Sequence, residues 1–373
     1  MKIETKAVHV GRKPEAGSRD VTPAIHLSTT FQKADDGSLP GGYLYSRPNN
    51  PNRAALEEAL ASLEEGAAAL AFSSGNAATA SLFQALSPGD HVIAGDDVFY
   101  GTAVLLNNHL SKWGLTASYV DMRDLGALER ALTPATKLIW AETPSNPLLH
   151  VTDLRAVAAI AKKAGALLAC DNTWATPLLQ QPFKLGADVV MHSVTKYLSG
   201  HSDVLSGTLI FKETNALFEH VRDIQHEGGA VPSPFECWLT MRGLQTFPYR
   251  VRAQSQSAQK IAEFLSCQPK IETVHYPGLP SHPGHKIASS QMSSFGGMMS
   301  IQVQGGQAEA FKLAAGVKLF THATSLGGAH SLIEHRASVE GAVTHAPPNL
   351  LRLSIGLEHV DDLIEDLEQA LLF

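Results

Sequence analysis

Short apolar runs alternate with helical repeats of hydrophobic residues between residues 52 and 211. Runs rich in Val, Leu, Ile and Ala are typical of buried strands, and they predict strands at 67–72, 91–94, 137–141, 166–169, 189–191 and 208–211. Between them apolar residues recur three or four positions apart, as Leu56, Leu60 and Leu63 do, on one face of a helix. Strands that are apolar throughout and alternate with helices predict an α/β fold, with a mainly parallel sheet covered by helices on both faces.

The pattern changes at both ends of this region. The first 51 residues are polar and rich in Pro and Gly, so we predict an extended arm rather than a helix or a sheet. The loop 228–234 interrupts the alternation, and a long helix at 250–265 follows it. Strands are predicted beyond that helix at 272–275, 298–303 and 350–355. We therefore predict an N-terminal arm at 1–51, a large domain at 52–234 and a smaller α+β domain at 235–373.

Composition narrows the possible partners. Hydrophobic residues make up 44% of the chain and charged residues 17%, which is typical of a globular protein. The net charge of −7 lacks the basic bias of nucleic-acid-binding proteins, and no apolar stretch is long enough for a membrane span, so we expect neither partner. The first residues lack an apolar signal core, and the three cysteines are widely spaced, so we expect a cytoplasmic protein with reduced thiols. No cluster of histidines, cysteines and acids has the spacing of a metal site, so we expect no metal.

Residues with reactive side chains directly follow several of the predicted strands. Tyr100, Asn146, Asp171 and Lys196 each lie just beyond a strand end. Ligands of parallel sheets bind at these carboxyl ends. A lysine after a buried strand is costly to place unless it is paired or used. Individually, Lys196 could be a surface residue, Asp171 a helix cap and Tyr100 a core residue. Their shared placement favours a common site.

These residues match the needs of pyridoxal 5′-phosphate (PLP), an aldehyde cofactor with a pyridine ring and a phosphate. Lys196 can supply the amine for a Schiff base, Asp171 a carboxylate for the ring nitrogen, and Tyr100 an aromatic face that stacks on the ring. A glycine turn at Gly75 opens an alanine-rich helix, and its free backbone N–H groups favour phosphate. We predict a phosphate site made of Gly75, Asn76, Ser193 and Thr195.

Short motifs with this chemistry extend along nearly the whole chain. They are Ser73-Ser74-Gly75, Tyr100-Gly101, Glu142-Thr143-Pro144-Ser145-Asn146-Pro147, Asp171-Asn172-Thr173, Ser193-Val194-Thr195-Lys196-Tyr197, Ser325-Leu326-Gly327-Gly328 and Leu351-Arg352-Leu353-Ser354-Ile355-Gly356. Together they resemble the Cys/Met-metabolism family of PLP-dependent enzymes, which includes cystathionine γ-synthase, cystathionine γ-lyase, cystathionine β-lyase and methionine γ-lyase. The resemblance implies the PLP-dependent transferase fold (fold type I), with a seven-stranded type of sheet.

The resemblance also implies a role for each matching residue. Lys196 is expected to carry the cofactor and move protons, with Asp171 at the ring nitrogen and Tyr100 on the ring face. Arg352 is expected to hold the substrate α-carboxylate through a bidentate pair, helped by Ser325. The other implied contacts are Gly75, Asn76, Asn146, Thr173, Ser193 and Thr195 for the cofactor, and Tyr45 and Asn146 for the substrate.

The N-terminal arm gains a function through the same resemblance. Tyr45 and Arg47 match a Tyr-x-Arg motif that completes the phosphate site of a neighbouring subunit. The active site is then shared between two chains of a dimer. Members of the family are typically homotetramers built from two such dimers, and we expect the same here.

The implied reaction is trans-sulfuration at Cγ of a homoserine- or cystathionine-type amino acid, by γ-elimination or γ-replacement. Cystathionine β-lyase and methionine γ-lyase activities stay open as alternatives. Asn76 replaces a more usual apolar residue, and Thr324 replaces a glutamate found in many γ-synthases and γ-lyases, where it recognises a distal amino group. These departures leave open a different class, a non-catalytic binding or regulatory protein on the same scaffold. The segment 330–336, which contains His335-Arg336, is also unlike the better-known members. Contact with the substrate is one possibility there, and we expect a solvated loop instead.

Overall fold

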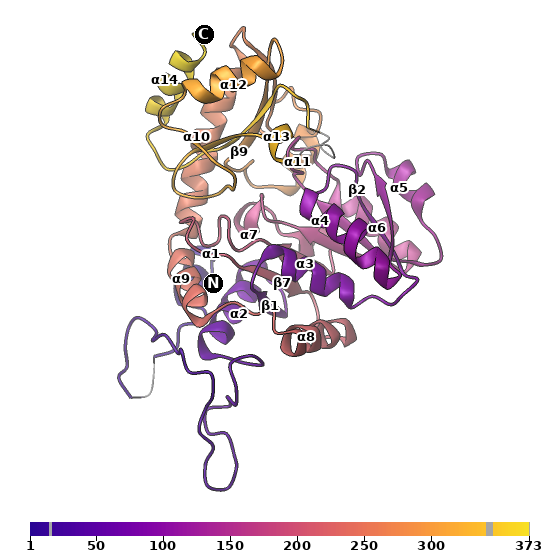
Figure 1. Ribbon diagram of the computed structural model, residues 1–373, viewed down its shortest axis with the longest axis vertical. Helices are drawn as coiled ribbons and strands as arrows, with labels where there is room; N and C mark the ends of the chain where they lie inside the picture. The colour runs from indigo at the N-terminus through magenta and orange to yellow at the C-terminus, as the bar shows by residue number, and fades with distance from the viewer. Residues whose placement is uncertain (15–16, 341–345, 373) are drawn as a thin grey trace.

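Two sheets with their own helices organise the chain, which the computed structural model describes over residues 1–14, 17–340 and 346–372 (Figure 1). The helices are α1 (Ile3–His9), α2 (Pro51–Glu64), α3 (Gly75–Gln84), α4 (Tyr100–Val104), α5 (Leu125–Ala131), α6 (Leu154–Ala164), α7 (Thr176–Leu179), α8 (Ala216–Gly228), α9 (Pro234–Leu244), α10 (Phe247–Ser266), α11 (His285–Gln291), α12 (Gln307–Gly316), α13 (Arg336–Glu340) and α14 (Val360–Ala370). The strands are β1 (Ala68–Phe72), β2 (His91–Gly95), β3 (Thr116–Val120), β4 (Thr136–Glu142), β5 (Leu167–Asp171), β6 (Val189–His192), β7 (Gly207–Phe211), β8 (Ile271–His275), β9 (Met298–Val303), β10 (Thr321–His322), β11 (Leu332–His335) and β12 (Leu350–Ser354).

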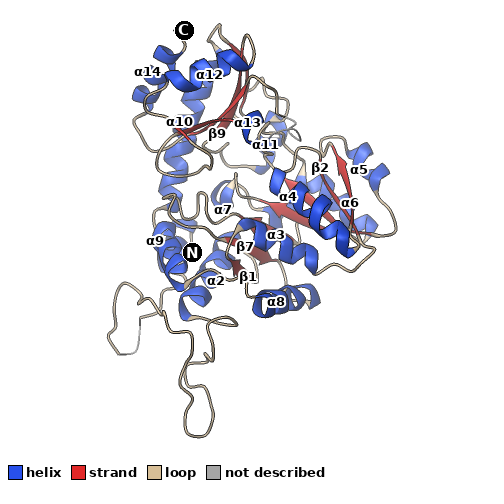
Figure 2. Cartoon of the chain, viewed as in Figure 1, coloured by secondary structure: helices blue, strands red, loops and turns tan. Residues whose placement is uncertain are grey.

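The first sheet has seven strands in the order β1-β7-β6-β5-β4-β2-β3. Only β7 runs antiparallel to its neighbours, and the other pairs are parallel. Side chains of β6 alternate between the two faces: Val189 and Met191 pack in the core that includes α3 and α8, whereas Val190 packs in the core that includes α2. Helices therefore cover both faces (Figure 2), which explains the continuous apolar runs and confirms the predicted α/β fold.

The second sheet has the order β10-β11-β12-β9-β8 and is antiparallel except between β10 and β11. Leu351 and Leu353 of β12 pack in a core that also includes residues of α10, α12 and α14. Arg352 lies between them in the strand and therefore points to the opposite face. On that face Ser300 of β9 donates a hydrogen bond of 2.7 Å to the carbonyl of Pro147, so the polar face of the small sheet meets the large domain.

Packing divides the chain differently from the predicted boundaries. Residues of α9 and the first half of α10, such as Met241 and Phe247, belong to the same core as α2, whereas the core of the second sheet takes residues of α10 from Ala258 onward. The loop 228–234 is thus internal to the large domain, and α10 joins the two cores. The predicted arm also contains a helix, α1, which is anchored by buried Ala7. Residues 17–50 contain no helix or strand, and loops among them project from the body (Figure 1).

Candidate active site

A cavity of about 360 Å³ lies between the strand ends of the large sheet and the polar face of the second sheet. Its wall contains most of the residues that the sequence predicted, namely Gly75, Asn76, Asn146, Asp171, Thr173, Ser193, Thr195, Lys196, Ser325 and Arg352. These residues come from the start of α3, from the ends of β4, β5 and β6, and from a loop and strand β12 of the second domain, so the fold alone brings them together. Tyr45, Arg47 and Tyr100 do not line this cavity.

Lys196 follows β6 and extends its amine toward the second domain. Its Nζ donates a hydrogen bond of 2.9 Å to Ser325 Oγ. Burial, helped by the positive charges of Arg352 and Arg336 and opposed by the charge of Glu334, lowers the pKa of Lys196 from 10.5 to about 8. The amine is therefore neutral far more often near neutral pH than an exposed lysine is, as a nucleophile or a general base requires.

Arg352 is held rigidly above the strand ends. Its guanidinium donates hydrogen bonds of 3.1 Å to Asn146 Oδ1, 3.1 Å to the Ser325 carbonyl and 2.6 Å to Glu334 Oε2. The side chain is buried, with an exposed fraction of 4%. A buried guanidinium that is fixed on several sides is well suited to bind a carboxylate in one orientation.

Asp171 lies at the opposite end of the cavity, at the end of β5. Its Oδ1 accepts a hydrogen bond of 3.0 Å from the Thr173 backbone, and Thr173 Oγ1 accepts one of 2.9 Å from the Ser193 backbone. Burial raises the pKa of Asp171. Within the described part of the chain Asp171 forms no ion pair, so a protonated ring nitrogen would supply the counter-charge that this buried carboxylate lacks.

The start of α3 forms the third side of the cavity. Ser74 caps the helix by accepting a hydrogen bond of 3.0 Å from the Ala77 backbone, and the free N–H groups of the first turn favour an anion. A Cβ on Gly75 would lie 2.9 Å from Met191 Cε and 3.2 Å from Ser193 Cβ, so the strand and the helix start approach closely only with glycine here. Together with the hydroxyls of Ser193 and Thr195, this end fits the phosphate of PLP.

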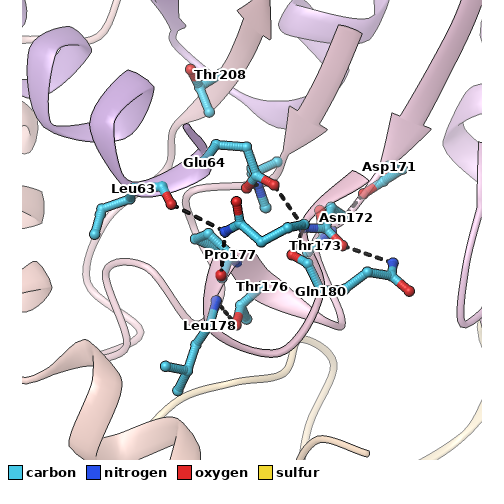
Figure 3. Close-up of polar contacts among 12 residues, drawn as sticks. Leu63, Glu64, Asp171, Asn172, Thr173, Thr176, Pro177, Leu178, Gln180 and Thr208 are labelled. Carbon is cyan, nitrogen blue, oxygen red and sulfur yellow. Dashed lines mark hydrogen bonds and ion pairs between the residues drawn. The ribbon is translucent and has the colours of Figure 1, made fainter. Parts of the chain in front are cut away.

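A buried polar network beneath the site joins β5, β6 and α2 (Figure 3). Asn172 Nδ2 donates to Glu64 Oε1 at 3.2 Å and to the Gln180 carbonyl at 3.1 Å, and Gln180 returns a hydrogen bond of 3.0 Å to Asn172 Oδ1. The second carboxylate oxygen of Glu64 lies 2.7 Å from His192 Nε2. Because Asn172 and His192 adjoin Asp171 and Ser193, the network fixes the ends of the two strands that carry the site.

Tyr100 lies outside the active-site cavity, and its role on the ring face stays a prediction. Tyr100 is the first residue of α4, its side chain is 42% exposed, and it lines a different cavity with Asn107. Phe99 lines the active-site cavity instead, and its backbone N–H donates a hydrogen bond of 2.7 Å to Glu142 Oε2. Phe99 precedes α4 and Tyr100 is its first residue, so the two adjacent aromatic side chains point to different cavities. The adjacent pair Phe99-Tyr100 was the signal in the sequence, and it did not reveal which ring faces the site.

The expectation of a solvated loop at 330–336 was wrong. Residues 332–335 form β11, and Glu334, His335 and Arg336 are all buried. Strand β11 pairs with β12 so that Glu334 lies opposite Arg352. Arg336 lines the cavity, as in the alternative that gave this segment a contact with the substrate, whereas Glu334 was not singled out by the sequence. The available signal in the sequence was an acid, Glu334, directly after the apolar residues Leu332 and Ile333.

Tyr45 and Arg47 belong to the arm, outside the cavity of their own chain. Arg47 Nη1 donates a hydrogen bond to the His226 carbonyl and lies 3.2 Å from a carboxylate oxygen of Glu227. Both residues line a surface hollow beside Gly229. Their role in a neighbouring subunit stays a prediction.

Across the described residues, no helix is both long and apolar enough to cross a bilayer. The same residues contain no group of three or more His, Cys, Asp or Glu side chains that could hold a metal ion. All three cysteines are free thiols, with Cys170 and Cys237 buried and Cys267 exposed.

Known proteins resemble this chain over its full length. A model of the family described as Cys/Met metabolism PLP-dependent enzyme matches residues 4–372. A cystathionine gamma-synthase of Mycobacterium tuberculosis is 48% identical over 98% of this chain and 96% of its own, and a cystathionine beta-lyase of Coxiella burnetii is 41% identical over 99% and 97%. The crystal structure of metB from Corynebacterium glutamicum superposes with a TM-score of 0.97 at 42% identity and covers 100% of this chain and 98% of that one. The chain therefore belongs to the Cys/Met metabolism family of PLP-dependent enzymes.

Proposed function

We propose that the chain is a trans-sulfuration enzyme that acts at Cγ of a homoserine- or cystathionine-type amino acid, by γ-replacement or γ-elimination. The observation that carries this proposal is the hydrogen bond between Lys196 and Ser325 in a cavity that also contains Arg352. An amino acid anchored by its carboxylate at Arg352 would present its Cα and Cβ protons to one buried amine. The 48% identity to a protein named cystathionine gamma-synthase supports reaction at Cγ.

PLP, when bound, supplies an electron sink for negative charge at Cα. Asp171 would hold the positive charge of the ring nitrogen, and the start of α3 with Ser193 and Thr195 would hold the phosphate. Lys196, whose pKa is lowered by burial, would remove the proton from Cα and pass it on to the bound cofactor. The amine, neutral again, would then remove a proton from Cβ, and the γ-substituent would leave with the electron pair of its bond to Cγ. Ser325 would orient the amine between these positions.

The proposal includes an active site shared between two chains. The arm at 17–50 extends from the body, and Tyr45 is 43% exposed (Figure 1). In a dimer these features would let Tyr45 and Arg47 reach the phosphate end of the neighbouring site. Two such dimers would form the homotetramer that the family resemblance implies.

A product assay tests the proposed reaction. The purified holoenzyme is offered an O-acylhomoserine with cysteine, cystathionine alone, and methionine alone, with a Lys196→Ala variant as control. We expect cystathionine from the first mixture or 2-oxobutanoate and cysteine from the second. Pyruvate and homocysteine as the main products would identify a β-lyase, and methanethiol from methionine a methionine γ-lyase. A holoenzyme that forms no product from any of them would favour the non-catalytic scaffold.

A further inference from the structure

A second guanidinium, that of Arg336, lies in the wall of the active-site cavity beside Arg352. Arg336 Nη1 donates a hydrogen bond of 2.9 Å to Glu334 Oε2, and Arg352 Nη2 donates one of 2.6 Å to the same oxygen. One carboxylate oxygen thus joins the two guanidiniums and holds them next to each other. All three side chains are buried, so this arrangement is built into the site rather than placed on its surface.

The strand register produces this arrangement. Glu334 in β11 is the partner of Arg352 in β12, so both side chains lie on the polar face of the second sheet. Arg336 is the first residue of α13, directly after β11, and the chain turns there so that its side chain reaches the same cavity. Arg336 lies close enough to Lys196 for its positive charge, like that of Arg352, to lower the pKa of the amine.

Besides Arg352 and Arg336, the described residues on this side of the cavity are Thr324, Ser325 and Leu326, and none of these is an acid. The acids among the described wall residues, Glu142 and Asp171, come from β4 and β5 at the cofactor end. Glu334 is not part of the wall, because it lies behind the arginines and accepts their hydrogen bonds. The described residues of the substrate side are therefore suited to anionic groups, since two guanidiniums and no acid are among them.

We propose that Arg336 is a specificity-determining residue that binds a carboxylate at the distal end of the substrate side chain, while Arg352 binds the α-carboxylate. The preferred substrate is then a 2-amino acid whose γ-substituent ends in a carboxylate, such as homoserine acylated by a dicarboxylic acid. Arginine forms bidentate, charge-assisted hydrogen bonds with carboxylates, which supplies both the affinity and the orientation. The identity of the γ-substituent as an acyl group rests on the proposed function, but the preference of Arg336 for a distal carboxylate does not.

Three unreactive ligands of equal length test the binding preference. L-2-Aminoadipate, L-norleucine and L-lysine share a six-carbon 2-amino acid chain and end in a carboxylate, a methyl group and an ammonium group. Titration of the holoenzyme by calorimetry should show that 2-aminoadipate binds about 10- to 100-fold more tightly than norleucine, and lysine more weakly than either. In Arg336→Met the preference for 2-aminoadipate over norleucine should disappear, and Arg336→Lys should restore part of it.

Matched variants separate recognition from damage. Arg336→Gln keeps a donor for Glu334 and should lose the preference as Arg336→Met does, while Arg155→Met removes an exposed arginine and should keep it. Equal weakening of all three ligands in Arg336→Met would mean that both guanidiniums hold the α-carboxylate, and it would overturn the proposal. Equal affinity of the unmodified holoenzyme for 2-aminoadipate and norleucine would overturn it as well.

Turnover gives an independent readout. The ratio of kcat/KM for O-succinyl-L-homoserine to that for O-acetyl-L-homoserine, each with cysteine, should fall about 10- to 100-fold in Arg336→Met, because a general loss of activity cancels in the ratio. An unchanged ratio would contradict the role of Arg336. Absence of turnover with both esters would instead count against reaction at Cγ, and the calorimetric preference would still decide the role of Arg336.

Discussion

The amine of Lys196 and the hydroxyl of Ser325 lie 2.9 Å apart, although 129 positions separate the two residues in the chain. Lys196 follows β6 of the large sheet, and Ser325 lies between β10 and β11 of the second sheet. Ser325 has a φ of 92°, in the left-handed region that residues with a side chain rarely adopt. We infer that this costly backbone conformation is kept because it places the hydroxyl against the reacting amine.

Two substitutions of Ser325 separate the hydroxyl from the backbone strain. Ser325→Ala removes the hydroxyl and keeps the strain, whereas Ser325→Gly removes both. We expect kcat to fall about tenfold or more in both variants, since each loses the same charge-assisted hydrogen bond. In chemical unfolding the glycine variant should be more stable than the alanine variant by about 1 kcal/mol. An alanine variant with full kcat would show that Ser325 does not position Lys196.

The lowered pKa of Lys196 predicts the pH dependence of cofactor capture. Only the neutral amine attacks the aldehyde, so the rate at which the apoenzyme takes up PLP should rise with pH and level off above about 8. In Arg352→Met a positive neighbour is lost and the protonated amine is favoured, so the apparent pKa should move upward. Stopped-flow absorbance across this pH range measures both. A rate that keeps rising to the ordinary lysine value of 10.5 would contradict the burial argument.

Phe99 and Tyr100 should differ in their effect on cofactor affinity. Phe99 lines the active-site cavity, so Phe99→Ala should weaken PLP binding about tenfold through the loss of an aromatic contact. Tyr100 lines a neighbouring cavity, and Tyr100→Ala should have a smaller effect. Equilibrium dialysis of PLP against each apoenzyme measures the dissociation constants. The reverse order would favour Tyr100 as the residue on the ring face.

The buried pair of Glu64 and His192 should contribute to stability. Both side chains are at most 2% exposed, and their closest atoms are 2.7 Å apart. Glu64→Ala leaves the polar groups of His192 and Asn172 without their buried partner, and it should lower the free energy of unfolding by about 3–5 kcal/mol. Glu64→Gln keeps the shape and a hydrogen-bonding group, so its thermal midpoint should lie between those of the alanine variant and the unmodified protein. Equal midpoints for all three would show that the network contributes no stability.

A mixing experiment tests the shared active site. Lys196→Ala and Arg47→Ala should each be nearly inactive alone, because each removes one contribution to every site. After unfolding and refolding together at equal concentration, heterodimers should carry one intact site, with Lys196 from one chain and Arg47 from the other. We expect recovery of about a quarter of the unmodified activity. No recovery, with assembly confirmed by size-exclusion chromatography, would mean that Arg47 does not act across subunits.

Much of the large domain could be predicted because its strands are buried on both faces. The run at 189–191 is apolar for that reason. One edge of the sheet could also be predicted to carry Gly75 at the start of α3 and the residues that follow β4, β5 and β6. Strand β11 was missed because Glu334 and His335 make it polar, and their burial depends on partners in other elements. A loop in the sequence does not reveal which core the next helix joins, so the packing of α9 against α2 could not be foreseen.

The sequence by itself determined the α/β architecture, the family and the set of residues at the strand ends, since apolar periodicity and short motifs are local properties of the chain. Only the tertiary structure decided that Phe99 rather than Tyr100 faces the cavity, because one residue at the start of α4 sets the direction of both side chains. It alone also joined Arg336, Glu334 and Arg352, because the pairing of β11 with β12 and the turn into α13 set their distances. Which substrate the site accepts therefore depends on contacts between residues that are distant in the sequence.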